Sequence, residues 1–191
     1  KLFYVIYNVN NDGFYCYTTP DIENGTWKAY YIQTSFHDPA LIFDGDGMYV
    51  IYSGNNIQKI SLKESSAEGG IGKEGSSRAL FNKTLGGFKW SLWEGAHAYK
   101  IGDYYYLMII GSYGSWFRRE VCYRSKKLYD SKASDWEAQL IFEGSTYEYG
   151  TGIAQGGIVD TIYGDWYGFL FQDHDGLGRV PSILAVNWDY V

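Results

Sequence analysis

The stretch HDPALIFDGDGMYVIYSG, residues 37–54, decides the fold, because the chain repeats its pattern twice more. EGAHAYKIGDYYYLMIIGS (94–112) and QGGIVDTIYGDWYGFLFQD (155–173) follow the same order of a strand, a tight Gly/Asp turn and an aromatic strand. The repeats begin about 55 to 60 residues apart. Each turn contains a residue that tolerates positive φ, as two-residue hairpins require. These turns are predicted at Asp46-Gly47, Gly102-Asp103 and Gly164-Asp165.

Further strand-like stretches lie between the hairpins, such as 56–60 and 120–125, which makes about four strands per unit. Almost no segment has a 3.6-residue period, so the chain is predicted to be all-β. Repeated four-stranded units of this length fit the blades of a β-propeller. A sandwich would show more even spacing and no long-range self-similarity.

The ends of the chain resemble parts of blades. Residues 1–19 are typical of the second and third strands of a blade whose first strand is absent, and 179–188 of a late strand. We interpret Lys63 to Arg78 as a polar loop between blades. Residues 1–191 then form one partial propeller domain: part of blade 1, blades 2 and 3, and most of blade 4. Because roughly three and a half blades cannot close a ring, we expect the native protein to be longer at both ends.

Composition excludes some partners. The net charge is −6 and Lys and Arg are scattered, so nucleic acid is not expected as a partner. No apolar run approaches the roughly 18 residues of a membrane helix, so no membrane span is expected. Aromatic residues make up 19% of the chain, which suits β-sheet cores and surfaces that stack on sugar rings. Cys16 and Cys122 lie far apart and are predicted to be buried thiols.

The residues that open each repeat are the candidate functional residues. In a propeller the innermost strands line the central channel, so His37-Asp38-Pro39, residues 94–97 and residues 155–157 should converge there. Asp38 and Glu94 then occupy equivalent places in successive units. Two carboxyl groups at one site are the minimum for glycoside hydrolysis, one as an acid and one as a base. Like charges held close also raise a carboxyl pKa, which suits a general acid.

Five stretches in order together resemble glycoside hydrolase family 43: residues 35–52, 93–108, 119–128 (REVCYRSKKL), 155–173 and 178–188 (GRVPSILAVNW). The resemblance covers about Leu2 to Trp188 and implies a five-bladed propeller enzyme that acts by inversion on arabinose- and xylose-containing plant polysaccharides. The branch with the FQD and GRVP segments resembles α-L-arabinofuranosidases and β-xylosidases, which often carry a C-terminal β-sandwich domain.

Carried over by position, Glu94 matches the general acid of the family, and Asp38 the aspartate that tunes the pKa of the acid and orients it. The base aspartate of the family lies in the first strand of blade 1, which is expected to be missing from this chain. Asp12 does not replace it, since Asn11-Asp12-Gly13 is a hairpin turn. Two departures are Ala96, where proline is usual, and Ala154, where histidine is common.

Four residues are predicted to bind substrate: Phe36, His37, Gln155 and Arg179. Phe36 could instead be a core residue, and Gln155 is predicted to line the channel. Arg179 is either a rim arginine near the −1 sugar or a structural partner of a carboxylate. His37 and His97 are predicted to orient other groups or to pack in the core, not to ligate metal. Residues 44–47 lack the ligands of an EF-hand, no cofactor is required, and the resemblance allows a structural calcium ion.

The function expected from these features is that of an inverting glycoside hydrolase of the arabinofuranosidase or xylosidase type. Its partners would be plant cell-wall oligosaccharides or polysaccharides and the missing propeller segments, from the same longer chain or another chain. The alternatives are a non-catalytic carbohydrate-binding propeller, an inactive fragment without the catalytic base, or a protein-interaction propeller. We expect a secreted or periplasmic location, with the cytoplasm as the alternative.

Overall fold

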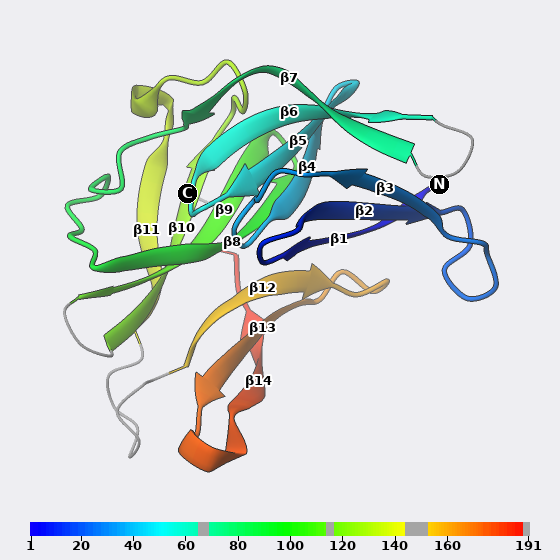
Figure 1. The fold of residues 1–191 in the computed structure, drawn as a ribbon. Coiled ribbons are helices and arrows are strands. Elements are labelled where there is room, and N and C mark those ends of the chain that lie inside the picture. Colours follow the sequence, from blue (N-terminus) through cyan, green and yellow to red (C-terminus); the bar gives the residue numbers. More distant parts are fainter. Residues whose placement is uncertain (65–68, 114–116, 144–152, 189–191) are drawn as a thin grey trace.

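The computed structural model of the protein describes residues 1–64, 69–113, 117–143 and 153–188 (Figure 1). Within these ranges the elements are strands, apart from two 3-10 turns of three residues each, η1 (Ala133–Asp135) and η2 (Asp175–Leu177). The strands are β1 (Phe3–Val9), β2 (Gly13–Thr19), β3 (Lys28–Ile32), β4 (Ala40–Asp44), β5 (Gly47–Tyr52), β6 (Asn56–Lys63), β7 (Gly69–Ala79), β8 (Leu92–Ile101), β9 (Tyr104–Tyr113), β10 (Phe117–Ser125), β11 (Glu137–Glu143), β12 (Ala154–Asp160), β13 (Trp166–Asp173) and β14 (Arg179–Val186). In the part of the chain that is described, no helix has the length and apolar character needed to cross a bilayer.

The strands form three sheets. A seven-stranded sheet has the order β1-β2-β3-β7-β6-β5-β4, a four-stranded sheet the order β11-β10-β9-β8, and a three-stranded sheet the order β12-β13-β14. The three predicted hairpins are β4–β5, β8–β9 and β12–β13, one per repeat. The seven-stranded sheet combines two antiparallel groups, β1–β3 and β4–β7. A short parallel pairing of Tyr30 and Tyr31 in β3 with Gly69 and Gly70 in β7 joins these groups.

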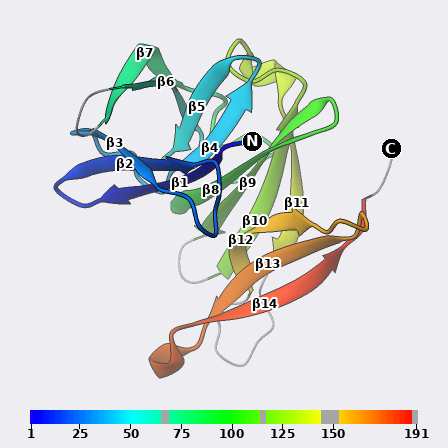
Figure 2. The same ribbon diagram turned by 90° about the vertical axis from the view of Figure 1, so that its right-hand side faces the viewer.

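The inner strands of the three repeats lie side by side. β8 contacts both β4 and β12, and Figures 1 and 2 show β8 between them from two directions. This is the arrangement expected of strands that line a common channel.

The predicted turns are partly corrected. Asp44 pairs with Gly47, so the first turn is Gly45-Asp46, one residue earlier than predicted, with Gly45 at φ +54°. Gly102-Asp103 is the two-residue turn that the sequence predicts, with Gly102 at φ +56°. The third connection is a five-residue loop, 161–165, because the hydroxyl of Thr161 accepts hydrogen bonds from the backbone N–H groups of Tyr163 and Asp165. A side chain thus closes this wider loop.

The interpretation of Lys63 to Arg78 as a polar loop is wrong. Gly69–Ala79 forms the long strand β7, which pairs with β6 and with β3, and residues 65–68 lie outside the described residues. Most of its side chains are small or charged, as suits an outer strand with one face in water. Gly69 is needed at the contact with β3, because a Cβ there would lie 2.2 Å from the Tyr30 ring.

Two hydrophobic clusters hold the sheets together. One packs β2 and β3 against β5 and β6 and contains Phe14, Cys16, Tyr30, Val50 and Ile60. The other lies between the seven-stranded and four-stranded sheets and contains Ile51, Phe81, Leu107, Tyr123 and Trp136. Cys16 and Cys122 are free thiols; Cys16 is buried as predicted, whereas Cys122 is half-buried. Desolvation raises the pKa of each thiol to about 12.

A hydrogen bond fastens the same two sheets at the turn end of β4. The Tyr105 hydroxyl, at the start of β9, donates to Oδ1 of Asp44, the last residue of β4. β4 is therefore tied to the next sheet at the end opposite to Asp38.

Candidate active site

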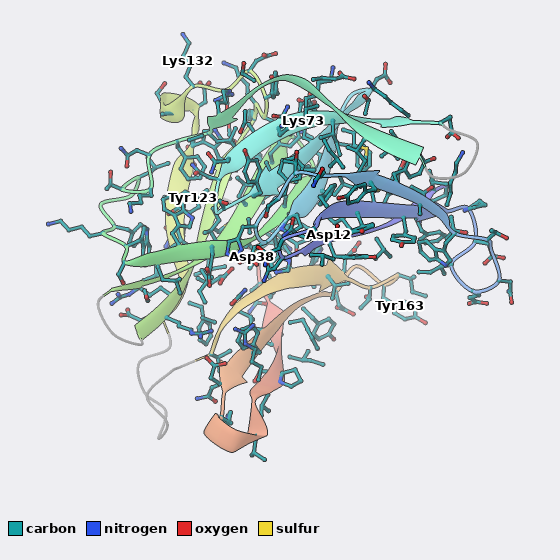
Figure 3. All side chains as sticks on the ribbon, viewed as in Figure 1. Asp12, Asp38, Lys73, Tyr123, Lys132 and Tyr163 are labelled. Carbon is teal, nitrogen blue, oxygen red and sulfur yellow. The ribbon has the colours of Figure 1, made fainter. Side chains whose placement is uncertain are left out.

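Glu94, His37 and Asp38 come together at the start of the inner strands. Nε2 of His37 lies 3.4 Å from Oε2 of Glu94 and 3.5 Å from Oδ2 of Asp38. The side chains of His37, Asp38 and Glu94 are 58%, 36% and 31% exposed, so a ligand can reach them. The convergence predicted from the repeats is therefore observed for this pair of carboxyl groups, with an imidazole between them. In Figure 3, Asp38 lies near the middle of the molecule, where β8 and β12 approach each other.

The backbone around these residues contains two positive φ angles and a bulge. Asp38 has φ +47°, in the left-handed region that aspartate tolerates better than most residues. The carbonyl of His37 accepts a hydrogen bond from the N–H of Ser53, which fixes the segment before β4. In β8 the register shifts between Glu94 and His97, and Gly95 has φ +66°. This bulge turns the Gly95 N–H toward Oδ2 of Asp38, at 3.2 Å.

A cavity of about 390 Å³ opens beside the carboxyl group of Asp38. It is lined by inner-strand residues, including Asp38, Gly95, His97, Tyr99 and Gln155. A larger cavity of about 670 Å³ lies between β10–β11 and β13–β14, lined largely by aliphatic side chains such as Leu140 and Leu184. We assign the site to the smaller cavity, because Asp38 lines it together with Gly95, the residue after Glu94. The carboxyl group in the larger cavity, Glu137, is paired with Arg124.

Gln155 lines this cavity, as predicted. It has φ +58° at a register shift between Ala154 and Gly156, and its backbone N–H donates to Oε2 of Glu120 at 3.0 Å. Its side-chain amide lies against Gly95, so that a Cβ on Gly95 would be 2.5 Å from Nε2 of Gln155.

His97 and Tyr99 follow Glu94 in β8 and line the same cavity. The His97 side chain is exposed in the cavity, and the protein packed around it still removes enough water to lower its pKa, opposed by the charge of Asp38. The Tyr99 hydroxyl accepts the N–H of Ile158 at 2.9 Å, which ties β8 to β12. Gly157 is needed there, since a Cβ would lie 2.1 Å from the Tyr99 hydroxyl.

The prediction that Phe36 contacts sugar is corrected. Phe36 is 2% exposed and packs edge-on against Phe14 and Tyr52, with ring centroids 5.1 and 4.8 Å away. Its burial leaves no ring face free for stacking. The core alternative considered for this residue is the one observed.

Arg179 pairs with a carboxylate, the structural alternative considered for it. Its Nε lies 3.5 Å from Oδ1 of Asp173, and its guanidinium lies over the Phe171 ring at 4.5 Å from the centroid. Arg118 binds the other oxygen of Asp173 at 2.6 Å. Arg179 is 61% exposed and is not among the described residues that line the cavity beside Glu94.

Two residues were missed by sequence reasoning. Glu120 is fully buried against Gln155, and Tyr99 links two inner strands. A carboxyl at an inward-facing place in the alternating strand Glu120–Ser125 is a signal that could have singled out Glu120. Nothing in the sequence pattern distinguishes Tyr99 from the other tyrosines of its strand.

The three clustered side chains also have the spacing of possible metal ligands. His37, Asp38 and Glu94 each offer one ligand atom, all within 4.8 Å of one another. Calcium takes six to eight oxygen ligands, so two carboxylates and an imidazole are a poor match for it. In the structure Nε2 of His37 makes a long hydrogen bond of 3.4 Å to Oε2 of Glu94 and an ion-pair contact of 3.5 Å to Oδ2 of Asp38.

These features define a class of protein: an all-β partial propeller whose inner strands bring two carboxyl groups and an imidazole together beside a cavity. In comparisons with known proteins, residues 1–190 match the family described as glycosyl hydrolases family 43. The chain belongs to this family.

Several relatives extend this finding. The curated relative named "Putative beta-xylosidase" from Xylanibacter ruminicola is 26% identical over 194 residues, which cover 98% of this chain and 34% of the relative. The solved bifunctional GH43-CE protein of Bacteroides eggerthii is 30% identical with a TM-score of 0.79, covering 98% of this chain and 23% of its own. A xylan beta-1,4-xylosidase from Bacillus halodurans C-125 is 23% identical with a TM-score of 0.66, covering 98% and 39%.

The chain therefore spans about a third or less of the first of these relatives. The expected fold class, part of a five-bladed all-β propeller, is confirmed by the sheets and by these fold neighbours. The family includes arabinofuranosidases, xylosidases and arabinanases that act on plant polysaccharides, so homology supports a glycosidase.

Proposed function

We propose that this chain forms part of an inverting glycoside hydrolase that acts on arabinose- or xylose-containing plant oligosaccharides or polysaccharides. The observation that carries the proposal is the His37 imidazole between the carboxyl groups of Glu94 and Asp38, of which Asp38 lines the cavity. The names of the Xylanibacter and Bacillus relatives support xylose-containing substrates, without separating them from arabinose-containing ones.

In the proposed reaction, Glu94 donates a proton to the departing glycosidic oxygen. Asp38 and His37 hold the Glu94 carboxyl in place, since His37 lies within hydrogen-bonding reach of both carboxyl groups. Water attacks the anomeric carbon from the opposite face and loses its proton to a base. Inversion requires the acid and the base to be roughly 6.5 to 9.5 Å apart, which leaves room for that water.

We further propose that the base lies outside residues 1–191. Asp12 is the first carboxylate of the chain, but it belongs to the turn between β1 and β2. Its Oδ2 accepts a hydrogen bond from the Tyr15 hydroxyl at 2.5 Å, and its Oδ1 one from Tyr31 at 3.3 Å. These contacts support a structural role for Asp12.

The proposal is tested by substituting Glu94 in the protein together with its missing segments. Glu94→Gln should lower kcat on arabinosyl or xylosyl oligosaccharides by at least about 100-fold, because general acid catalysis contributes that much or more. Glu137→Gln is the matched control, since Glu137 lies on the outer strand β11 and is 68% exposed. Near-normal hydrolysis by the Glu94 variant would refute the assignment of the acid.

The position of the base is tested separately with azide on the 191-residue chain. Azide is already an anion and needs no base to attack. It would form a C–N bond at the anomeric carbon as the glycosidic C–O bond breaks and the Glu94 proton passes to the leaving oxygen. We expect no hydrolysis in buffer, a glycosyl azide with azide present, and no azide product from Glu94→Gln. Ordinary hydrolysis by the 191-residue chain would show that the base lies within it.

A carbohydrate-binding propeller is the rival function. It is favoured because Asp12 is held by Tyr15 and Tyr31 and so is not available as a catalytic base. Binding of xylo- or arabino-oligosaccharides by the protein with its missing segments, with no turnover, would support this rival. We also propose a secreted or periplasmic location, where plant polysaccharides are accessible, and no required cofactor. Chelation with EDTA should then leave hydrolysis unchanged.

A further inference from the structure

Glu120 is a buried carboxyl group that the proposed reaction does not use. It lies in β10 with 0% exposure. Its Oε2 accepts the backbone N–H of Gln155 at 3.0 Å, while Oε1 receives no hydrogen bond from the described residues. Burial raises the pKa of this carboxyl well above its usual value, opposed by the hydrogen bond from Gln155. A carboxyl is costly to bury, so its place in the interior calls for a physical reason.

Glu120 lies in the same cross-strand row as Glu94. Glu120 is opposite Ile110 in β9, and Ile110 is opposite Glu94 in β8. Directly opposite residues of antiparallel strands point to the same face of a sheet, so the two carboxyl groups flank Ile110 on one face. A register shift follows each of them, between Glu94 and His97 and between Glu120 and Val121. A bulge changes the direction of nearby side chains, and here one bulge follows each of the two carboxyl residues of the same cross-strand row.

Gln155 connects Glu120 to the site. Its φ of +58° is uncommon for a residue with a side chain, and the register shift takes it out of the β12–β13 pairing. Its N–H is therefore free to bind Glu120. Its side-chain amide then lies against Gly95, whose own N–H donates to Asp38. The contacts form a continuous path from Glu120 through Gln155 and Gly95 to Asp38.

We propose that Glu120 is a positioning residue, which holds the Gln155 N–H and thereby fixes the Gln155 side chain against Gly95, beside Glu94. Without an acceptor at position 120, the Gln155 N–H would be buried and unpaired, and the backbone would relax from its left-handed conformation. The Gln155 amide would then leave Gly95. Only the catalytic consequence of this arrangement rests on the proposed function.

The test compares Glu120→Gln with Glu120→Leu by two-dimensional amide NMR of the full chain. Glutamine keeps a carbonyl oxygen that can accept the Gln155 N–H, whereas leucine has a similar volume and no acceptor. We expect Glu120→Leu to shift the amide resonances of both Gln155 and Gly95, and Glu120→Gln to leave Gly95 close to its original position. Gln58→Leu is the control: Gln58 is 3% exposed in β6 and donates to the carbonyls of Lys59 and Glu74. It should lower stability and leave the Gly95 resonance in place.

Gln155→Gly gives a second route if Glu120→Leu fails to fold. Glycine accepts the positive φ but removes the side-chain amide, so the Gly95 resonance should shift while the core around Glu120 is unchanged. In the active protein, Glu120→Leu should lower kcat roughly 100-fold, as misplacement of reacting groups can, and Glu120→Gln should restore most of it. A Gly95 resonance that stays unmoved in Glu120→Leu and Gln155→Gly would overturn the proposal. Absence of hydrolysis in the parent protein would instead count against the proposed function, because the NMR comparison does not depend on turnover.

Discussion

His37 is the residue that contacts both carboxyl groups of the site, Glu94 and Asp38. Its imidazole reaches both carboxyl groups, yet its side chain is 58% exposed and contributes little to the core. Removing it should therefore affect chemistry and leave the fold intact.

We expect His37→Ala to lower kcat/KM by roughly 10-fold, the size of effect that follows from losing one hydrogen bond to a charged group. His37→Gln should recover part of this loss, since its amide nitrogen can occupy the place of Nε2. Thermal midpoints of both variants should match that of the parent. A large fall in thermal midpoint without a change in kcat/KM would contradict this role.

His97 should make stability depend on pH. Its folded-state pKa is lowered by desolvation, so the folded protein favours the neutral ring. The stability that His97 contributes is thus present above its unfolded pKa of about 6.5 and is lost as pH falls toward the folded value. Denaturation midpoints between pH 7.5 and pH 5 should fall less in His97→Gln than in the parent. Parallel curves for the two proteins would exclude this effect.

At the residue scale, the sequence predicted the meeting of Asp38 and Glu94 because both open a repeat. It could not predict that Phe36, one residue before His37, turns into the core, because φ values near Asp38 are not visible in a pattern of residue types. Glu120 was missed for a similar reason: its partner Gln155 is 35 residues away and is bound through a bulge.

At the scale of elements, glycines decide how the inner strands approach one another. Gly95 and Gly102 lie in the same hairpin with similar φ values of +66° and +56°. A Cβ at Gly95 would meet Gln155 and Ile110, whereas a Cβ at Gly102 would meet open space. Substitution of Gly102 therefore measures the cost of backbone strain alone, and substitution of Gly95 measures that cost together with the cost of a steric clash.

We expect Gly102→Ala to cost about 1–2 kcal/mol of unfolding free energy, from left-handed strain alone. Gly95→Ala should cost more and should also lower activity, because the new methyl group displaces the Gln155 amide from its place against residue 95. Urea denaturation and steady-state kinetics measure the two effects. Equal costs at the two positions would contradict the close contact with Gln155.

The hairpins were predictable because strand alternation and Gly/Asp turns are local features. β7 was not predictable, because its small and charged residues do not alternate clearly. Its strand conformation depends on backbone pairing with β6 and β3, which a local pattern does not reveal. The third turn was lengthened by the Thr161 side chain, which no turn rule based on Gly and Asp includes.

At the scale of the whole molecule, two sheets have uncovered apolar faces. On β1–β2, Val5 and Tyr7 are 46% and 39% exposed, beside the stacked rings of Tyr15 and Tyr17. On β12–β14, Val159, Phe169 and Ile183 are 54–66% exposed. Contiguous apolar faces of this kind usually mark interfaces, and they support the proposal that further propeller segments cover them.

The 191-residue chain should therefore self-associate as its concentration rises. Phe169→Thr should weaken this association, measured by sedimentation velocity. Ile22→Thr should not, since Ile22 is 56% exposed but lies in the loop between β2 and β3. Supplying the missing segments should suppress association of the parent chain. A monomer at all concentrations would argue against these faces as interfaces.

The hydrogen bond between Tyr105 and Asp44 helps to fix the position of β4, and through it the position of Asp38 in the site. β4 is held to the four-stranded sheet at its far end by this bond and at its near end by the Gly95 N–H on Asp38. The segment from Asp38 to Asp44 is about 20 Å long at roughly 3.3 Å per residue, so a small change in its direction at Asp44 displaces Asp38. With the far end pinned, a tilt of only about 3° would move Asp38 by about 1 Å, a misplacement that can lower the rate 100-fold. The Tyr105 hydroxyl, at the opposite end of β4, therefore helps to set the distance between Asp38 and Glu94.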